Sequence, residues 1–310
     1  MVIRILLAIM AIQIAIALGI CYAAAAYVPP GFALLLALLA VVLVRMTITA
    51  NNFRLARRFG STVPAESRLA PPARLRLFLG EFRATMLTSS WYMLRYRPAP
   101  FLAGTTSISD TPLPVLLVHG YGCNGGYWAP LRALLRREGI RHDAVDLEPF
   151  TASIDDFIEP VEQGVRRLLA ATGAPQVVIV GHSMGGLVAR AWLRRHGPDN
   201  VARIVTIGTP HHGTALAGFG IGANALQMRR DSAWLAQLNG DDSAFRPVLT
   251  SIWSWHDNII APQDSCRLPG AKNVTFAGIG HVALGSDPRV LACVLEEILT
   301  ATTPSATLSC

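Results

Sequence analysis

Long, almost uninterrupted apolar stretches occupy the first fifty residues of the chain. Residues 5–28 and 32–50 contain few polar side chains, apart from Arg45 near the end of the second stretch. As helices that rise 1.5 Å per residue, they would be about 36 Å and 28 Å long, which suits a bilayer crossing. Val28-Pro29-Pro30-Gly31 lies between them and predicts a turn. We therefore expect residues 1–50 to form a membrane-anchoring helical hairpin.

A signal peptide is the competing interpretation of this segment. Arg4 would supply its positive start, and Ala23 to Ala26 would offer a cleavage site. However, the first stretch is longer than a usual signal core of about 7–15 residues, and the second would still anchor the product. A third interpretation places both helices inside the protein, but helices that are apolar on all faces need lipid or a large core around them.

The residues that follow, 51–111, are expected to form a basic linker and an amphipathic helix. Gly60, Pro64, Pro71 and Pro72 interrupt any helix between residues 60 and 72. Apolar side chains then recur at helical spacing, at Leu75, Phe78, Leu79, Phe82, Met86 and Met93. The polar side chains lie elsewhere on the same helix, at Arg74, Arg76, Glu81 and Arg83. Such a helix either lies on the membrane surface or packs on the rest of the protein.

From residue 112 onward, short apolar runs alternate with amphipathic stretches. The apolar runs predict strands, at 114–120, 143–147, 176–180, 201–207, 248–255 and 273–279. The amphipathic stretches predict helices, at 126–138, 153–172, 184–196 and 288–300. Strands that alternate with helices form a mostly parallel sheet with helices on both faces. We therefore predict an α/β domain over residues 112–302, followed by a tail at 303–310.

The net charge of +7 is concentrated next to the apolar stretches. Residues 45–97 carry ten arginines and two glutamates, whereas residues 98–310 have a net charge of −2. The α/β domain is therefore not basic, and no nucleic-acid partner is expected. Arg54, Arg57 and Arg58 follow the second stretch, so the positive-inside rule predicts a multi-pass inner-membrane protein with its α/β domain in the cytoplasm.

The sequence Gly181-His182-Ser183-Met184-Gly185-Gly186 directly follows one predicted strand and opens the next predicted helix. A G-x-S-x-G sequence in this context is typical of a nucleophile elbow, a sharp turn that projects a serine hydroxyl into a cleft. The glycines leave out side chains that would clash at such a turn. This pattern predicts nucleophilic catalysis by Ser183.

A serine nucleophile needs a base, and the base needs an orienting acid. In enzymes with this elbow the chain order is serine, acid, histidine. His281 follows the last predicted strand, satisfies that order and is predicted to be the base. His211 and His212 also follow a strand, but only Asp199 lies between Ser183 and these histidines as an acid.

Asp257 is the predicted acid, because it directly follows the apolar run 248–255. Asp264 is its rival, seven residues farther along in a more polar loop. Asp241 and Asp242 come before the strand and are weaker candidates.

The oxyanion of an acyl-transfer intermediate needs two hydrogen-bond donors. The backbone N–H of Met184, the residue after the nucleophile, is one predicted donor, and the backbone N–H of Tyr121 is the other. Tyr121 follows His119-Gly120 at the end of the first predicted strand. Glycines and turn-forming residues follow it and let the loop approach the site closely.

Four segments resemble bacterial triacylglycerol lipases and esterases of the α/β-hydrolase superfamily. They are Val-His-Gly-Tyr-Gly at 118–122, Gly-His-Ser-Met-Gly-Gly-Leu at 181–187, Gly-Thr-Pro-His-His-Gly-Thr at 208–214 and Asp-Asn-Ile-Ile-Ala-Pro at 257–262. The resemblance covers about residues 112–302 and implies the α/β-hydrolase fold and ester hydrolysis without metal or organic cofactor. It also implies a cap region at about 214–246. Within the cap, Ala223 to Leu238 is helix-prone and offers an acyl-binding surface, with Leu226, Met228, Trp234, Leu235 and Leu238.

The sequence therefore predicts a membrane-anchored serine carboxylester hydrolase that acts on acyl-ester or lipid substrates and contacts membrane lipids. An acyltransferase or thioesterase with the same three residues is the alternative, and a non-catalytic membrane scaffold is a second one. The five cysteines, Cys21, Cys123, Cys266, Cys293 and Cys310, show no metal-binding spacing. Free thiols are expected, with a Cys266–Cys310 bond left open.

Overall fold

The computed structural model describes residues 1–102 and 112–302. Within these residues, six strands form one sheet in the order β2-β1-β3-β4-β5-β6, and every neighbouring pair is parallel. The strands are β1 (Val115–Val118), β2 (His142–Val145), β3 (Val177–His182), β4 (Val201–Ile207), β5 (Leu249–Ser254) and β6 (Lys272–Phe276). The predicted parallel sheet is confirmed, with strand ends that differ from the prediction by a few residues.

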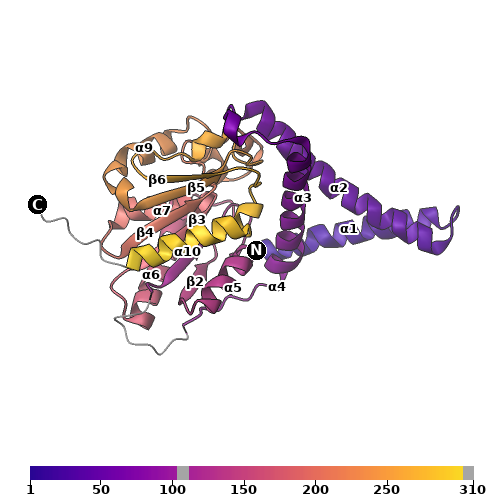
Figure 1. Cartoon of the computed structure of the whole chain (residues 1–310). Coiled ribbons are helices and arrows are strands. Elements are labelled where there is room, and N and C mark those ends of the chain that lie inside the picture. Colours follow the sequence, from indigo (N-terminus) through magenta and orange to yellow (C-terminus); the bar gives the residue numbers. More distant parts are fainter. Residues whose placement is uncertain (103–111, 303–310) are drawn as a thin grey trace, which may run out of the picture.

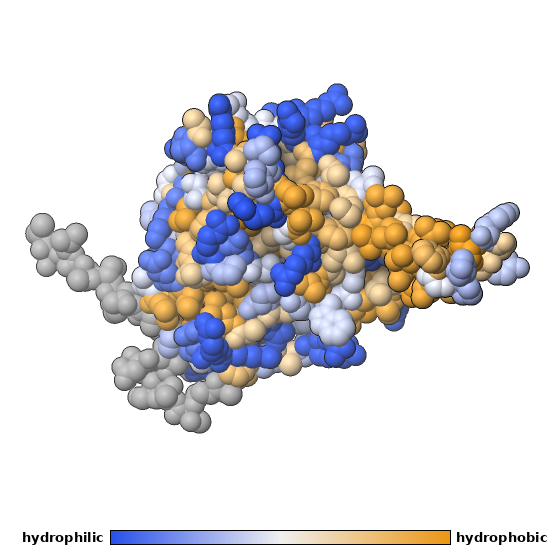
Figure 2. All heavy atoms as spheres, turned by 45° about the vertical axis from the view of Figure 1, so that its right-hand side comes forward, coloured by the Kyte–Doolittle hydropathy of each residue, from blue (hydrophilic) through white to orange (hydrophobic). Residues whose placement is uncertain are grey.

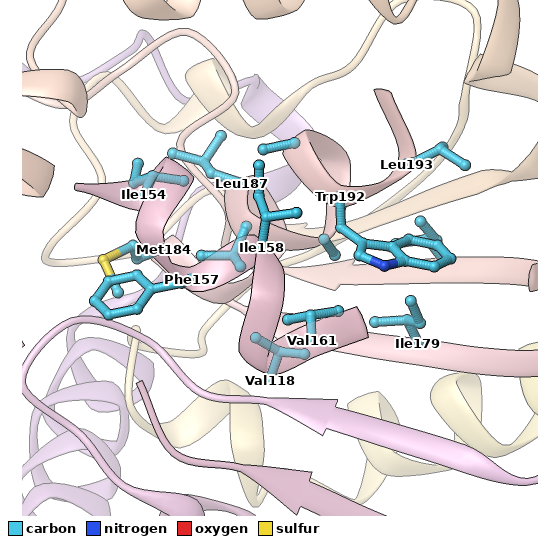
Figure 3. Close-up of a cluster of buried hydrophobic side chains, with 14 of the residues drawn as sticks. Val118, Ile154, Phe157, Ile158, Val161, Ile179, Met184, Leu187, Trp192 and Leu193 are labelled. Carbon is cyan, nitrogen blue, oxygen red and sulfur yellow. The ribbon is translucent and has the colours of Figure 1, made fainter. Parts of the chain in front are cut away.

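Helices cover both faces of this sheet, as predicted (Figure 1). α6 (Ile158–Thr172) and α7 (Met184–His196) pack on one face, and α5 (Ala129–Arg137) and α10 (Pro288–Thr302) pack on the other. Figure 3 shows the core on the α6 and α7 face, where Phe157 lies beside Met184 and Trp192 lies farther along the sheet. Burying a side chain as large as Phe157 contributes about 1.5–3 kcal/mol to folding. This core fixes the start of α7, and with it the turn that carries Ser183.

The segment Ala223 to Leu238, which the sequence marks as helix-prone, is helical in two pieces. The cap region contains the short helices α8 (Ala223–Gln227) and α9 (Ala233–Asp241). The chain turns between them because Asp231 takes a positive φ of 62° and Ser232 caps α9, accepting a hydrogen bond from the Leu235 amide at 3.2 Å. A serine in this position competes with the backbone and starts a new helix.

The predicted acyl-binding surface of the cap is largely wrong. Met228, Leu235 and Leu238 are buried in the core against α7 rather than exposed to a cleft. Leu226 is exposed, together with Phe219 and Ile221 from the preceding turn. We call Phe219, Ile221 and Leu226 the apolar rim.

The first fifty-nine residues form a helical hairpin that projects from the α/β domain (Figure 1). α1 (Val2–Ala24) and α2 (Pro30–Phe59) are both long and apolar enough to cross a membrane, with a mean hydropathy of 2.5 in their most apolar windows. None of the α1 window and 11% of the α2 window is buried, which argues against two core helices. Figure 2 shows apolar side chains over the projecting hairpin and paler, more polar residues at its far tip.

α2 continues nine residues past the predicted end of the hairpin at residue 50. No helix-breaking residue occurs before Gly60, where the backbone becomes extended. Arg45 does not simply reach outward from this helix. Its guanidinium donates to Gln13 Oε1 of α1 at 2.7 Å and to Ser90 Oγ at 2.7 Å, so it joins the two helices to the segment that follows α3.

The predicted amphipathic helix is α3 (Pro71–Leu87), which continues through a π-helical turn (Thr88–Tyr92) into the short α4 (Met93–Arg95). Two of its predicted apolar positions, Leu75 and Leu79, are exposed, whereas Leu77, Glu81 and Ala84 are buried. These three follow helical i, i+4 and i+7 spacing. The glutamate is tolerated on this face because the domain supplies hydrogen-bond donors to it.

Four cysteines, Cys21, Cys123, Cys266 and Cys293, are free thiols. Cys310 and any bond from it to Cys266 lie outside the described residues.

Candidate active site

Ser183 stands at the turn between β3 and α7 with φ 54° and ψ −124°, a conformation that is rare for a residue with a side chain. The neighbouring glycines make the turn possible. A Cβ atom at Gly185 would lie 2.1 Å from the Val118 carbonyl oxygen, and one at Gly181 would lie 2.7 Å from the Gly185 carbonyl oxygen. The strained serine and its clash-free surroundings match the predicted elbow.

His281 and Asp257, the predicted base and acid, are in contact with each other. His281 Nδ1 lies 2.7 Å from Asp257 Oδ2, and both side chains are buried. The other oxygen of Asp257 accepts hydrogen bonds from the Ile259 and Ile260 amides at 2.8 and 2.7 Å. The two amides thus hold one oxygen of the carboxylate, and the other oxygen is directed at the imidazole.

Neighbouring charges allow the buried His281 ring to take up a proton. Burial alone would lower the pKa of His281, but the Asp257 carboxylate and the charge of Glu81 raise it above the usual value. A base with this environment is suited to accept a proton from a serine hydroxyl and to keep it as an imidazolium.

His182 brings the serine and the histidine loop together. Its ring nitrogen Nε2 lies 3.3 Å from the His281 carbonyl oxygen, and the two rings are 4.6 Å apart. Within the described residues, no hydrogen bond joins the Ser183 hydroxyl to the His281 ring. Catalytic hydrogen bonds often tighten only when substrate is bound, so the arrangement is compatible with a resting site.

The rival residues have structural partners instead. Asp264 is exposed and accepts a hydrogen bond from the Ser61 hydroxyl at 2.7 Å. His211 is buried between Arg190 and Thr206, at 3.1 Å from each. Burial and the neighbouring Arg190 charge lower the pKa of His211 well below its usual value, which leaves its ring neutral.

The two predicted oxyanion donors lie on loops that approach the serine. A Cβ atom at Gly120 would lie 2.9 Å from the Ser183 Cβ, so the strand β1 loop passes directly beside the elbow. His119 fixes this loop, because its Nε2 accepts a hydrogen bond from the Leu147 amide at 3.1 Å. In the part of the chain that the structure describes, neither the Tyr121 nor the Met184 amide donates to another protein group.

The Tyr121 side chain has a separate position. Its hydroxyl donates to the Ile221 carbonyl at 2.8 Å and accepts from the Ile221 amide at 3.1 Å. These bonds tie the β1 loop to the cap beside the apolar rim. Exposed apolar side chains therefore border the loop that carries the predicted oxyanion donor.

Glu81 is the site residue that the sequence did not indicate. Its carboxylate accepts hydrogen bonds from the amides of Val282 and Ala283, the two residues after His281, at 3.1 and 2.9 Å. A Cβ atom at Gly280 would lie 2.5 Å from Glu81 Oε2, so the histidine loop is in tight contact with this group. Burial raises the pKa of the Glu81 carboxyl, although the two amide hydrogen bonds act in the opposite direction.

A signal for Glu81 was present only in the helical spacing Leu77–Glu81–Ala84. A glutamate on an otherwise apolar face normally indicates a solvated position. The partners that stabilise Glu81 lie two hundred residues away, so the local pattern cannot reveal them.

Comparison with known proteins supports the same fold. Residues 114–251 match the family model described as the alpha/beta hydrolase fold. Among solved structures, mature Bacillus licheniformis lipase BlEst2 aligns with a TM-score of 0.58 at 16% identity, covering 66% of this chain and 100% of that one. Aspergillus fumigatus lipase B aligns with a TM-score of 0.54 at 18% identity, covering 64% of this chain and 55% of that one.

Parts of the chain are also similar to known lipases. A Burkholderia plantarii triacylglycerol lipase is 34% identical over 131 residues, which is 39% of this chain and 36% of the lipase. A Pseudarthrobacter phenanthrenivorans triacylglycerol lipase is 36% identical over 119 residues, which is 35% of this chain and 36% of the lipase. The chain thus matches about a third of the length of these relatives. Together with the elbow geometry and the parallel sheet, these similarities show that the chain has the alpha/beta hydrolase fold.

Proposed function

We propose that the chain is a membrane-anchored serine carboxylester hydrolase that works through an acyl-enzyme on Ser183. The observation that carries this proposal is the buried Asp257–His281 pair, whose imidazole lies 4.6 Å from the ring of His182, the residue before the strained Ser183. His281 takes the hydroxyl proton as the Ser183 oxygen attacks the ester carbonyl, and the Tyr121 and Met184 amides stabilise the oxyanion. The leaving alcohol receives the proton from His281. A water molecule, deprotonated by the same histidine, then releases the acid and restores the serine.

A fluorophosphonate label, followed by a series of p-nitrophenyl esters of increasing chain length, tests this function. We expect covalent labelling of Ser183 and release of p-nitrophenol. Labelling with efficient transfer to an added alcohol or thiol, but slow hydrolysis, would instead favour the acyltransferase or thioesterase alternative. No labelling of the folded chain would favour the non-catalytic scaffold.

We propose Glu81 as a positioning residue for His281, because it holds the backbone of the histidine loop from helix α3. Glu81→Gln leaves one of two part-buried amides without its acceptor and removes a negative charge near the imidazole. We expect kcat to fall about tenfold, with a small change in KM. Because the charge of Glu81 raises the pKa of His281, the acid limb of kcat should also move to lower pH. The measurement is a pH–rate profile on a soluble ester.

The exposed Glu66, on the linker before α3, supplies the matched control. Glu66→Gln should leave both kcat and the acid limb unchanged. If Glu81→Gln lowers kcat but leaves the acid limb of the pH–rate profile unshifted, Glu81 acts on folding alone.

The hairpin is proposed to anchor the enzyme in the inner membrane, with the α/β domain in the cytoplasm. The apolar helices α1 and α2 satisfy their own backbone hydrogen bonds in lipid. Arg54, Arg57 and Arg58 each favour the anionic cytoplasmic surface by about 1 kcal/mol. In spheroplasts we expect alkaline carbonate to leave the protein in the membrane pellet, and external protease to spare the α/β domain.

Release of the chain by carbonate would rule out the hairpin. Digestion of the domain from outside would retain the anchor and reverse its orientation. A signal peptide would be revealed by a mature chain that begins near Ala26.

A further inference from the structure

A cavity of about 520 Å³ lies where the hairpin, α3 and the α/β domain meet. Phe53 of α2 and Phe78 of α3 form apolar parts of its wall, and their rings are 6.2 Å apart. Trp255, from the loop after β5, lines the domain side. Ser183 and His281 are not among its lining residues, whereas Asp257, the predicted acid, lines it from the domain side. Cavities of roughly 300–1,000 Å³ commonly bind small molecules.

Three arginines line the same cavity. Arg57 comes from the end of α2, Arg68 from the linker and Arg74 from the start of α3, and all three are exposed at their outer ends. None of them forms an ion pair with any residue in 1–102 or 112–302. Arg74 donates through Nε to the Leu69 carbonyl at 3.0 Å, and its other two nitrogens form no hydrogen bond within the described residues. A cationic rim over aromatic walls is complementary to an anionic amphiphile.

The position of the cavity identifies the source of such a molecule. It adjoins α2 between Ala50 and Gly60, the end of the helix that carries the basic cluster. In the topology proposed above, this is the headgroup level of the cytoplasmic leaflet, where anionic lipids are concentrated. Ala50 and Phe53 line the cavity from the part of α2 nearer its apolar stretch, which is the direction an acyl chain would follow.

We propose that this cavity binds an anionic glycerophospholipid, with its phosphate against Arg57, Arg68 and Arg74 and an acyl segment against Phe53 and Phe78. The inference rests on the proposed hairpin topology, but not on catalysis.

The same cavity adjoins the support of the predicted catalytic acid. Gln263 lines it and donates through Nε2 to the Asp257 carbonyl at 2.9 Å, while its Oε1 accepts from the Ser61 amide at 2.9 Å. A lipid in the cavity would pack against both sides of this connection. Binding of a lipid in the cavity would therefore stabilise the contact between the linker and the loop that holds Asp257.

The experiment measures quenching of Trp255 fluorescence in full-length Ser183→Ala protein, which cannot hydrolyse the probe. The protein is reconstituted in nanodiscs that contain phosphatidylglycerol or phosphatidylcholine with brominated acyl chains. We expect stronger quenching by the brominated phosphatidylglycerol, and loss of the excess in Trp255→Phe. The double variant Arg68→Gln/Arg74→Gln should need about tenfold more phosphatidylglycerol to reach half-maximal quenching.

Arg76→Gln/Arg83→Gln is the matched control, because both residues are exposed on α3 and neither lines the cavity. Brominated phosphatidylglycerol should quench the Trp255 fluorescence of this double variant as strongly as that of the parent protein. Equal quenching by the two lipids, or equal effects of the two double variants, would overturn the site. Displacement of the lipid by millimolar inorganic phosphate would overturn the phospholipid as its ligand. Fluorophosphonate labelling of the unmodified chain is a separate measurement, so failure of one proposal is not mistaken for failure of the other.

Discussion

Replacement of Ser183 by alanine should lower ester turnover by roughly 10⁴-fold or more. The hydroxyl is the only group at the elbow that can form the acyl-enzyme, and the imidazole of His281 cannot replace it. The fold should persist, because the change removes one oxygen and keeps the glycines that allow the turn. Turnover of a p-nitrophenyl ester and the thermal unfolding midpoint, measured on the same preparation, check the two statements.

Ser286→Ala supplies a control in the same neighbourhood. Ser286 is exposed, follows the His281 loop and donates through its hydroxyl to the Ala283 carbonyl at 3.3 Å. It should retain near-normal turnover. If Ser183→Ala also stayed within about tenfold of the parent, Ser183 would not be the nucleophile.

The sheet and the elbow could be predicted because their signals are local. β1 and β3 are buried on all sides, so they appear in the sequence as continuous apolar runs. Gly181 and Gly185 mark the only kind of residue that fits between the elbow and the neighbouring carbonyls. His281 and Asp257 followed from chain order, since parallel strands bring their carboxyl ends to one edge of the sheet.

The parts that were missed depend on contacts between distant segments. Glu81 is buried only because the Val282 and Ala283 amides meet it. Met228 and Leu238 were assigned to a substrate surface, but the bend at Ser232 turns them into the core against α7. Neither contact can be predicted from the periodicity of apolar residues in the local sequence.

The position of Glu81 has a consequence for how the chain is organised. The family match begins at residue 114, whereas the carboxylate that braces the histidine loop comes from α3. α3 also packs on α2 of the hairpin. The amino-terminal segment is thus in contact with the predicted catalytic histidine loop. A bound lipid, the hairpin and the acid–base pair are connected through adjoining contacts. We therefore expect the enzyme to have different activities in detergent and in bilayers.

Asp257→Asn should reduce kcat by up to about 10⁴-fold, while Asp264→Asn should have little effect. In Asp257→Asn, the side-chain oxygen would remain with the Ile259 and Ile260 amides, since those donors require an acceptor. The amide nitrogen would then face His281 Nδ1 and donate to it. That hydrogen bond selects the tautomer with the proton on Nε2, which cannot accept the proton of Ser183.

Asp264→Asn tests the assignment, because Asp264 is exposed and bonds to Ser61 rather than to a histidine. Both variants are compared by kcat on a soluble ester and by the rate of fluorophosphonate labelling, which also needs the base. Loss of the carboxylate removes the largest influence that raises the pKa of His281, so residual activity of Asp257→Asn should have its acid limb at lower pH. A damaging Asp264→Asn beside a mild Asp257→Asn would reverse the assignment. It would require the Asp264 loop to leave Ser61 and approach His281 when substrate binds.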